Sequence, residues 1–408
     1  MKLFLLVVMV TAISQGADAR PLTFAQALDA AASDAPTLAA RGLQAEAARA
    51  AAKAAAALPD PQVQFGFEGF PTSGANAFDP KRDDFSAVRI GITQDVPAAA
   101  KRRARAERAT ADIGSADAGR RTEARNVQIA TGLAWIDLST AARKLTALDT
   151  LERSISALSR TAPARTVTGS LRPGQSLEPA RLRADLADRR SALRAFAARA
   201  RAELTRWTGD PAPDVAGPPP EITVDAAELR AGLDELPSLQ VYGAIAAQAD
   251  ADVRLAQAER HPDWGWQASF AARDPRFGNM AAAGVTIGLP IFKRRRQDPL
   301  AAAKVLAAQG ARRDGDAARR AATAALDGDL ADHIMHHDRL HTATETLVPL
   351  AEKRAALERA SYAAGRASLG DALEAALALG EAQTDLIDRA ADVTREAVRI
   401  TLTYGSDR

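Results

Sequence analysis

The sequence predicts a mainly α-helical fold with a small membrane β part, built from two structural repeats. Three observations indicate this fold. About a quarter of the 408 residues are alanine, which is the best helix former and allows long helices to lie close together. A pattern of prolines followed by short strands occurs twice. Ten of the 18 aromatic residues fall within residues 62–96 and 264–292, where apolar and polar residues alternate.

The composition excludes several classes of protein. The chain has no cysteine, which rules out a disulfide scaffold, thiolate zinc sites and thiol catalysis. A formal net charge of +2 argues against general nucleic-acid binding, because that binding depends mainly on neutralising phosphates. The sequence also has no phosphate-binding loop, dinucleotide fingerprint or His-Glu-x-x-His run. We therefore expect no enzyme, no cofactor and no nucleic-acid partner.

Residues 1–19 have the features of a secretory signal peptide. Lys2 supplies the positive start, residues 3–10 form an apolar run, and Ala-Asp-Ala at 17–19 matches a small-x-small cleavage site. A buried N-terminal helix is the alternative, and the order of these features disfavours it. Because no later stretch approaches 18 uncharged apolar residues, we expect an exported chain without a transmembrane helix.

The remaining sequence divides into two similar halves, residues 20–209 and residues 221–408. Residues 210–220 hold five prolines and predict a stiff linker between the halves. A duplicated architectural unit explains the similarity better than alanine-rich composition does, because the proline spacing is not compositional. The interval between prolines is 25 residues in both halves, from Pro36 to Pro61 and from Pro237 to Pro262.

Each half contains two segments with the period-two alternation of a β-strand. The predicted strands span about residues 62–70, 85–96, 264–272 and 283–292. A strand of this length crosses a bilayer when tilted, and one apolar face opposite a small, polar face suits lipid outside a barrel and water inside it. A half-buried hairpin in a soluble protein has the same pattern. Four strands cannot close a barrel and open edges are not tolerated in lipid, so closure would need several chains.

A basic cluster follows the second predicted strand of each half, where a strand would leave the bilayer. We interpret both clusters as anchors at the level of the lipid headgroups, with each cation contributing on the order of 1 kcal/mol with anionic lipid. The solvated start of a helix is the alternative interpretation. The cations are Lys101, Arg102 and Arg103 in the first half and Lys293, Arg294 and Arg295 in the second.

Residues 98–160 and 295–360 contain little glycine or proline and predict two long helices. Sixty helical residues would span roughly 90 Å, which fits coiled-coil-like packing through small residues. Pro349 predicts a kink in the second helix. Interruptions that contain Gly169 and Gly365 predict hairpin turns where each long helix reverses.

Paired strands set between long alanine-rich helices, and duplicated, resemble the TolC-like outer membrane factors. The opening pattern Leu22-Thr-Phe-Ala-Gln-Ala-Leu28 and the tip pattern from Tyr362 to Glu374 carry the resemblance, which covers about residues 21–405. It implies a homotrimer in the outer membrane of a Gram-negative cell. Three chains with four strands each would form a twelve-stranded barrel, continued by an α-helical periplasmic tunnel. The duct would be passive and would work with a periplasmic adaptor protein and an inner-membrane transporter, expected to be of the RND type.

The same resemblance implies roles for residues near the helical tips. Asp371 and Glu374 correspond to acidic positions that line the narrow periplasmic entrance and favour cations. Their i, i+3 spacing puts both carboxylates on one helix face. Two solvated charges on a surface helix are the alternative. The residues expected in or beside the adaptor-facing hairpins are Gly169, Leu171, Gly365, Ser368 and Leu369.

Two features suggest heavy-metal export. The segment from Ile92 to Arg102 resembles the strand-to-helix junction of the cobalt-zinc-cadmium resistance subgroup, although Ala100 stands where those members usually have glycine. His333, His337 and His341 follow each other at i, i+4 and i+8, and imidazoles so spaced can share a borderline cation transiently. Ordinary packed or solvated helix positions are the alternative, since no cysteine completes a site.

The function expected from the sequence is therefore an outer-membrane efflux duct, with heavy-metal cations as its cargo. A duct for drug efflux or type I secretion has the same features. A soluble periplasmic helical structural or adaptor protein is the alternative from a different class, and it would bury the strands against protein instead of lipid.

Overall fold

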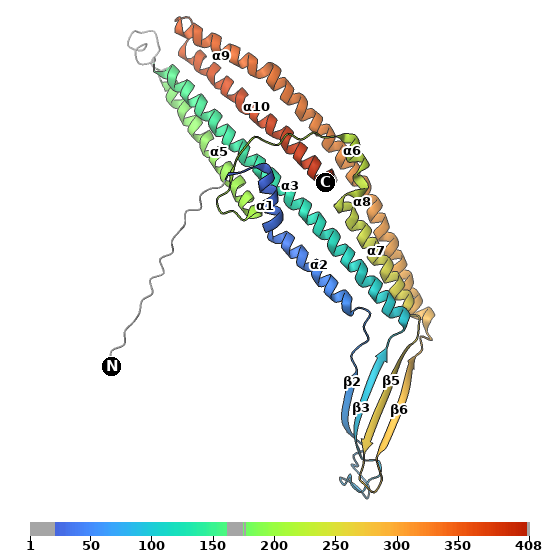
Figure 1. Cartoon of the computed structure of the whole chain (residues 1–408). Helices are drawn as coiled ribbons and strands as arrows, with labels where there is room; N and C mark the ends of the chain where they lie inside the picture. Colours follow the sequence, from blue (N-terminus) through green and yellow to red (C-terminus); the bar gives the residue numbers. More distant parts are fainter. Residues whose placement is uncertain (1–20, 161–173, 175–176, 406–408) are drawn as a thin grey trace, which may run out of the picture. The chain divides into compact units, whose positions relative to one another are not determined.

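The computed structural model describes residues 21–160, 174 and 177–405 (Figure 1). The predicted signal peptide, Gly169 and Leu171 lie outside the described residues. The chain forms two compact units, and each takes segments from both halves of the sequence. Unit 1 comprises Met1–Leu38, Ala124–Gly232 and Thr323–Arg408, and unit 2 comprises Ala39–Glu123 and Leu233–Ala322.

Long helices dominate the described chain, as the alanine content predicts. Three of them belong to both units: α2 (Pro36–Ala54), α3 (Ala99–Ser159) and α8 (Gln297–Thr342). The helices of unit 1 alone are α1 (Phe24–Asp34), α5 (Glu178–Thr208), α6 (Ala226–Ala231), α9 (Val348–Ala363) and α10 (Leu369–Tyr404). Unit 2 alone contains α7 (Pro237–Ala258) and the short 3-10 turns η2 (Leu233–Glu235) and η3 (Lys293–Arg295). Two short strands of unit 1, β1 (Pro21–Leu22) and β4 (Asp214–Val215), pair in parallel.

Large apolar side chains fill the core of unit 1. Trp135 is fully buried, and its ring meets Phe24 edge to face with 5.7 Å between the centroids. The indole Nε1 of Trp135 donates a hydrogen bond of 2.8 Å to the carbonyl oxygen of Leu22, which satisfies the buried polar atom. Helices α3 and α10 approach closely at Gly380, where an added Cβ would lie 2.5 Å from Cδ2 of Leu151.

The kink predicted at Pro349 is a π-helical turn. Helix α8 ends at Thr342, η4 (Ala343–Leu347) is π-helical, and α9 then continues to the tip. A proline inside a helix has no N–H to donate, and its ring clashes with the carbonyl group four residues earlier. The wider turn just before Pro349 accommodates this clash.

Helices α9 and α10 form a hairpin (Figure 1). Gly365 lies in the turn with φ +73°, a left-handed conformation that glycine adopts without steric cost. Ser368 then caps the start of α10: the backbone N–H of Asp371 donates to its hydroxyl at 3.2 Å, and its own N–H donates to the Asp371 carboxylate at 2.9 Å. This capping box fixes where the chain re-enters the helix.

The long helices of unit 2 bury alanine instead of large apolar side chains, and ion pairs also join them. Arg108 and Lys304 both bind the carboxylate of Asp252, at 2.5 and 3.0 Å. Arg254 binds Glu107 at 2.5 Å. These pairs join α7 to α3 and α8. The buried apolar residues of these three helices in unit 2 are Ala104, Ala118, Ala251, Ala258, Ala301 and Ala308.

One antiparallel sheet completes unit 2. Its strands lie in the order β2 (Gln62–Glu68), β3 (Ala87–Val96), β5 (Asp263–Ala272) and β6 (Met280–Gly288). Strand β6 begins at Met280 and ends at Gly288, whereas the sequence predicts residues 283–292. The ladder ends there because Gly288 pairs with Asp263, the first residue of β5, and Pro290 has no N–H to extend it.

Candidate functional site

The strand register collects apolar side chains on one face of the sheet. Phe65, Ile90 and Phe270 lie side by side across β2, β3 and β5, and Trp266 pairs with Val285 across β5 and β6. These side chains are largely exposed; Phe65, for example, exposes 78% of its surface. We call this surface the apolar face. It comprises Val63, Phe65, Phe67, Val88, Ile90, Ile92, Val96, Trp264, Trp266, Ala268, Phe270, Ala272, Ala281, Ala283, Val285 and Ile287, with Gln94 as its one polar side chain.

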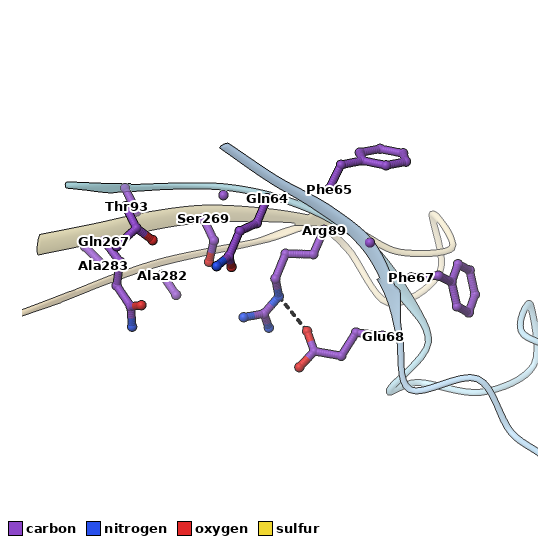
Figure 2. Close-up of a pocket in the computed structure, with 13 residues that line it drawn as sticks. Gln64, Phe65, Phe67, Glu68, Arg89, Thr93, Gln267, Ser269, Ala282 and Ala283 are labelled. Atoms are coloured by element: carbon purple, nitrogen blue, oxygen red, sulfur yellow. Dashed lines mark ion pairs between the residues drawn. The ribbon is translucent and has the colours of Figure 1, made fainter. Parts of the chain in front are cut away.

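The opposite face of the same sheet is small and polar. Figure 2 shows Gln64, Thr93, Gln267 and Ser269 on this side, with Phe65 directed away from them. The curved strands leave a hollow of about 320 Å³, lined by amide, hydroxyl and small side chains and, in addition, by Glu68, Arg89, Phe65 and Phe67. We call this surface the polar face. It comprises Gln62, Gln64, Gly66, Glu68, Ala87, Arg89, Gly91, Thr93, Asp95, Asp263, Gly265, Gln267, Ser269, Ala271, Ala282, Gly284, Thr286 and Gly288, with Met280 as its one large apolar side chain.

An ion pair lies towards one end of the polar face. Nε of Arg89 is 2.5 Å from Oε2 of Glu68, a diagonal neighbour on the adjacent strand (Figure 2). Both side chains remain about half exposed. The pair thus places one positive and one negative charge on the hollow side of the sheet.

Lys101 has different surroundings from those predicted. Its side chain is buried, and its ammonium group binds Asp263 at 2.7 Å and Glu259 at 3.0 Å. Burial alone would lower the pKa of Lys101, but hydrogen bonds to these two carboxylates outweigh it and raise the pKa. Asp263 also accepts the backbone N–H of Ala98 at 2.9 Å. Within the chain, Lys101 therefore joins the start of α3 to the start of β5 instead of facing solvent as a headgroup anchor would.

The other predicted anchors are more accessible. Arg103 is exposed, and so are Lys293, Arg294 and Arg295, which form the turn η3 just after β6. Arg102 is partly buried, and its Nε has no hydrogen-bond partner. Contact of these side chains with lipid headgroups stays a prediction.

The acidic residues predicted at the entrance have local partners. The Asp371 carboxylate completes the capping box of α10, and its hydrogen bonds from Ser368 lower the pKa of Asp371. Glu374 accepts a hydrogen bond of 2.9 Å from Nη2 of Arg354 on α9. Leu369 is buried in the apolar cluster around Tyr362 and Leu373, so its contribution to the tip is packing. Within one chain, both carboxylates therefore stabilise the hairpin.

The structure brings two of the three predicted histidine ligands together. The rings of His333 and His337 lie 4.6 Å apart and nearly perpendicular, while His341 is exposed one turn further on. His333 is buried, and its Nδ1 has no hydrogen-bond partner among the residues that the structure describes. Burial, together with the nearby His337, lowers the pKa of His333. Among the described residues, no three His, Asp or Glu side chains converge on a common point for a metal ion. Metal contact at this row stays a prediction.

A charged cluster near the end of α10 was missed by the sequence analysis. Arg399 binds Asp329 of α8 at 2.7 Å, and the Tyr404 hydroxyl donates to the same carboxylate at 2.8 Å. Burial and this hydrogen bond raise the pKa of Tyr404. Glu396 and Arg399, three residues apart on α10, were the local signal, but their partner lies about seventy residues earlier in the chain.

Comparison with known proteins identifies the fold. No protein-family model matches the sequence, and no curated protein matches it. The structure is similar to that of CusC, a protein studied for transmembrane channel formation, with a TM-score of 0.80, 14% identity, and coverage of 94% of this chain and 92% of CusC. The chain has a TolC-like channel fold. The Neisseria gonorrhoeae MtrE outer membrane channel in its open state gives a TM-score of 0.78, 16% identity, and 94% and 88% coverage.

The Campylobacter jejuni CmeC outer membrane channel is also similar, with a TM-score of 0.77, 12% identity, and coverage of 94% of this chain and 85% of CmeC. Identities this low establish the fold alone. Among the described residues, no helix combines the length and the hydropathy that a membrane-crossing helix requires.

Proposed function

We propose that this chain is the outer-membrane component of a tripartite efflux system and forms a passive duct from three copies. The observation that carries the proposal is the sheet of unit 2, which has an exposed apolar face, a hollowed polar face and two end strands, β2 and β6. Lipid on the first face and water on the second would satisfy both surfaces.

Closure of the sheet is the reason for proposing three copies. In lipid, the free N–H and C=O groups of an edge strand must find a partner. Strand β6 of one copy can pair with β2 of the next, so that three copies supply twelve strands. Such a barrel is wide enough to leave an aqueous lumen. We further propose that the periplasmic adaptor binds the helical tips near Gly365 and Ser368, and that an RND-type inner-membrane transporter supplies the energy.

Substitutions at two neighbouring residues of β2 test whether the apolar face contacts lipid. Phe65→Arg puts a charge on the apolar face and should lower barrel stability by about 2–4 kcal/mol, the cost of a cation near the bilayer midplane. Gln64→Arg puts the same charge on the polar face and should leave the trimer in the outer membrane. Membrane fractionation and native mass measurement in detergent report both effects. A wild-type chain recovered as a detergent-independent monomer in the periplasm would instead identify a soluble helical protein.

We propose heavy-metal cations as the cargo, supported by the row His333, His337 and His341 and by the segment from Ile92 to Arg102. Deleting the gene should reduce tolerance to zinc, cobalt, cadmium or copper, measured in a strain with no second duct. Substituting the three histidines with glutamine should reproduce part of this loss if the row contacts metal in transit. Unchanged metal tolerance with lost drug tolerance would assign the duct to drug efflux.

A further inference from the structure

We infer that the barrel, which is the part of the duct lined by the polar face, carries balanced charges at its outer end and therefore does not select between cations and anions. We infer that Arg89 and Glu68 together maintain this balance. The inference rests on the proposed function, because it takes the polar face to line the lumen. The inference limits what the cargo must be. A molecule would need to be small and soluble to pass the barrel that the polar face lines, and the sign of its charge would not matter there.

The middle of the polar face carries no ionised side chain among the described residues. One row across the four strands is Gln62, Thr93, Gln267 and Gly284, and the next is Gln64, Gly91, Ser269 and Ala282. Amide and hydroxyl groups offer both donors and acceptors to a passing solute. These rows therefore provide hydrogen bonds without preferring either sign of charge.

Ionisable residues of the polar face lie at its two ends. At the end next to the helices, Asp263 is bound by Lys101, whereas Asp95 forms no ion pair with the described residues. At the other end lie Glu68 and Arg89, 2.5 Å apart. In a trimer, three positive and three negative charges would face the lumen at this level, and their fields would largely cancel.

The two loops that follow this end of the sheet also carry equal numbers of positive and negative charges. Residues 69–86 and 273–279 carry four cations and four anions: Lys81, Arg82, Arg273 and Arg276 against Asp79, Asp83, Asp84 and Asp274. Arg276 binds Asp274 at 2.9 Å and Arg82 binds Asp79 at 3.3 Å, so part of this balance is also local. Arg89 and Glu68 are therefore the charges on the strands themselves whose removal would leave a net charge at this end.

Ion selectivity in a planar bilayer tests the inference. Wild type and variants are reconstituted, and the reversal potential is measured in a KCl gradient at or below about 0.1 M, where the screening length is about 10 Å. The wild-type permeability ratio of K⁺ to Cl⁻ is the reference, because it also reflects the acidic residues expected at the periplasmic entrance, Asp371 and Glu374. Glu68→Gln leaves three unpaired arginines and should shift the ratio about fivefold towards Cl⁻, and Arg89→Gln should shift it about fivefold towards K⁺.

The double variant Glu68→Gln/Arg89→Gln is the matched control, since it removes both charges and should return the ratio to the wild-type value. Native mass measurement confirms that each variant is still a trimer. Single variants with the wild-type ratio, or a double variant that differs from the wild type, would overturn the inference while leaving the duct intact. A correctly assembled wild-type trimer without any conductance would overturn the proposed function itself.

Discussion

The two units of the chain bury different kinds of side chain. The core of unit 1 contains Trp135, Ile136, Leu204, Leu373 and Ile400, all nearly inaccessible to solvent. The long helices of unit 2 bury alanines and are joined by ion pairs such as Arg254 with Glu107. Both units leave larger apolar side chains exposed, among them Leu43, Leu300 and Leu306 in unit 2 and Ile334, Leu350 and Leu357 in unit 1.

This difference indicates where each unit obtains its stability. Burial of apolar area stabilises by roughly 25 cal/mol per Å², so a buried leucine contributes far more than a buried alanine. Unit 1 can thus be stable within one chain. The long helices of unit 2 bury small side chains and depend more on close helix approach. Under the proposed function, neighbouring copies would also cover the exposed apolar residues of both units.

The largest expected effect is in unit 1. Trp135→Ala removes a fully buried ring, and it should lower the free energy of unfolding by about 3–5 kcal/mol, measured by urea denaturation and circular dichroism in detergent. Leu306→Ala is the comparison in unit 2; its side chain is 67% exposed in the chain. On an isolated chain it should cost less than about 0.5 kcal/mol. Equal losses would contradict the difference between the units.

The next effect concerns the buried cation of unit 2. Lys101→Met leaves Asp263 and Glu259 without their partner and should cost about 1–3 kcal/mol, less than for a fully buried pair because both carboxylates are half exposed. The pKa of Lys101 is raised in the fold. Its stabilisation is therefore complete below the unfolded-state pKa of about 10.4 and is lost as the pH rises through the folded-state pKa. Stability curves of wild type and variant should converge above that pH, and a constant gap would argue against this ion pair.

Alanine substitutions at two helical glycines compare how closely the helices pack in the two units. Gly380→Ala in unit 1 places a Cβ against Leu151 and should cost about 1–2 kcal/mol through overpacking. Gly114→Ala in unit 2 meets open space within the chain and should stabilise α3 by about 0.5–1 kcal/mol. Thermal unfolding of the detergent-solubilised chain measures both. Destabilisation by Gly114→Ala that appears only in the trimer would show that a second copy packs there.

The smallest effect is the salt dependence of unit 2. Arg254→Gln should cost about 0.2–1 kcal/mol at low salt and almost nothing at 1 M salt, because the screening length falls from about 10 Å to about 3 Å. Backbone amide hydrogen exchange, followed by mass spectrometry of peptides, measures this effect in each helix separately. Raising the salt should increase exchange in α7 more in the wild type than in Arg254→Gln, and an equal increase in both would contradict stabilisation of α7 by this ion pair.

Most of the architecture was predictable because its signals are local. Period-two alternation identified the four strands, and low glycine and proline content identified the long helices. The end of β6 was misplaced because it depends on where β5 begins, which alternation alone does not show. Similarly, i, i+4 spacing correctly brought His333 next to His337, but it could not indicate that Nδ1 of His333 is buried without a partner.

The chemistry of the charged residues was less predictable because their partners are distant in sequence. Lys101 looked like part of an exposed basic run, yet its partner Asp263 lies in the other half of the chain. Asp371 is the opposite case. The sequence Ser368-Leu-Gly-Asp371 is a local capping signal that could have been recognised, and it gives the carboxylate a structural role in the helix start.

Strands β2 and β6 also determine how the chain behaves before assembly. Under the proposed function, a newly exported copy would carry two unpaired strand edges beside an exposed aromatic surface, a combination that promotes aggregation. The concentration and lifetime of free chains would then decide how many reach the assembled state. High expression should therefore yield insoluble protein even for a sequence whose assembled form is stable, and periplasmic holding chaperones should raise the yield by shortening the exposure of these edges.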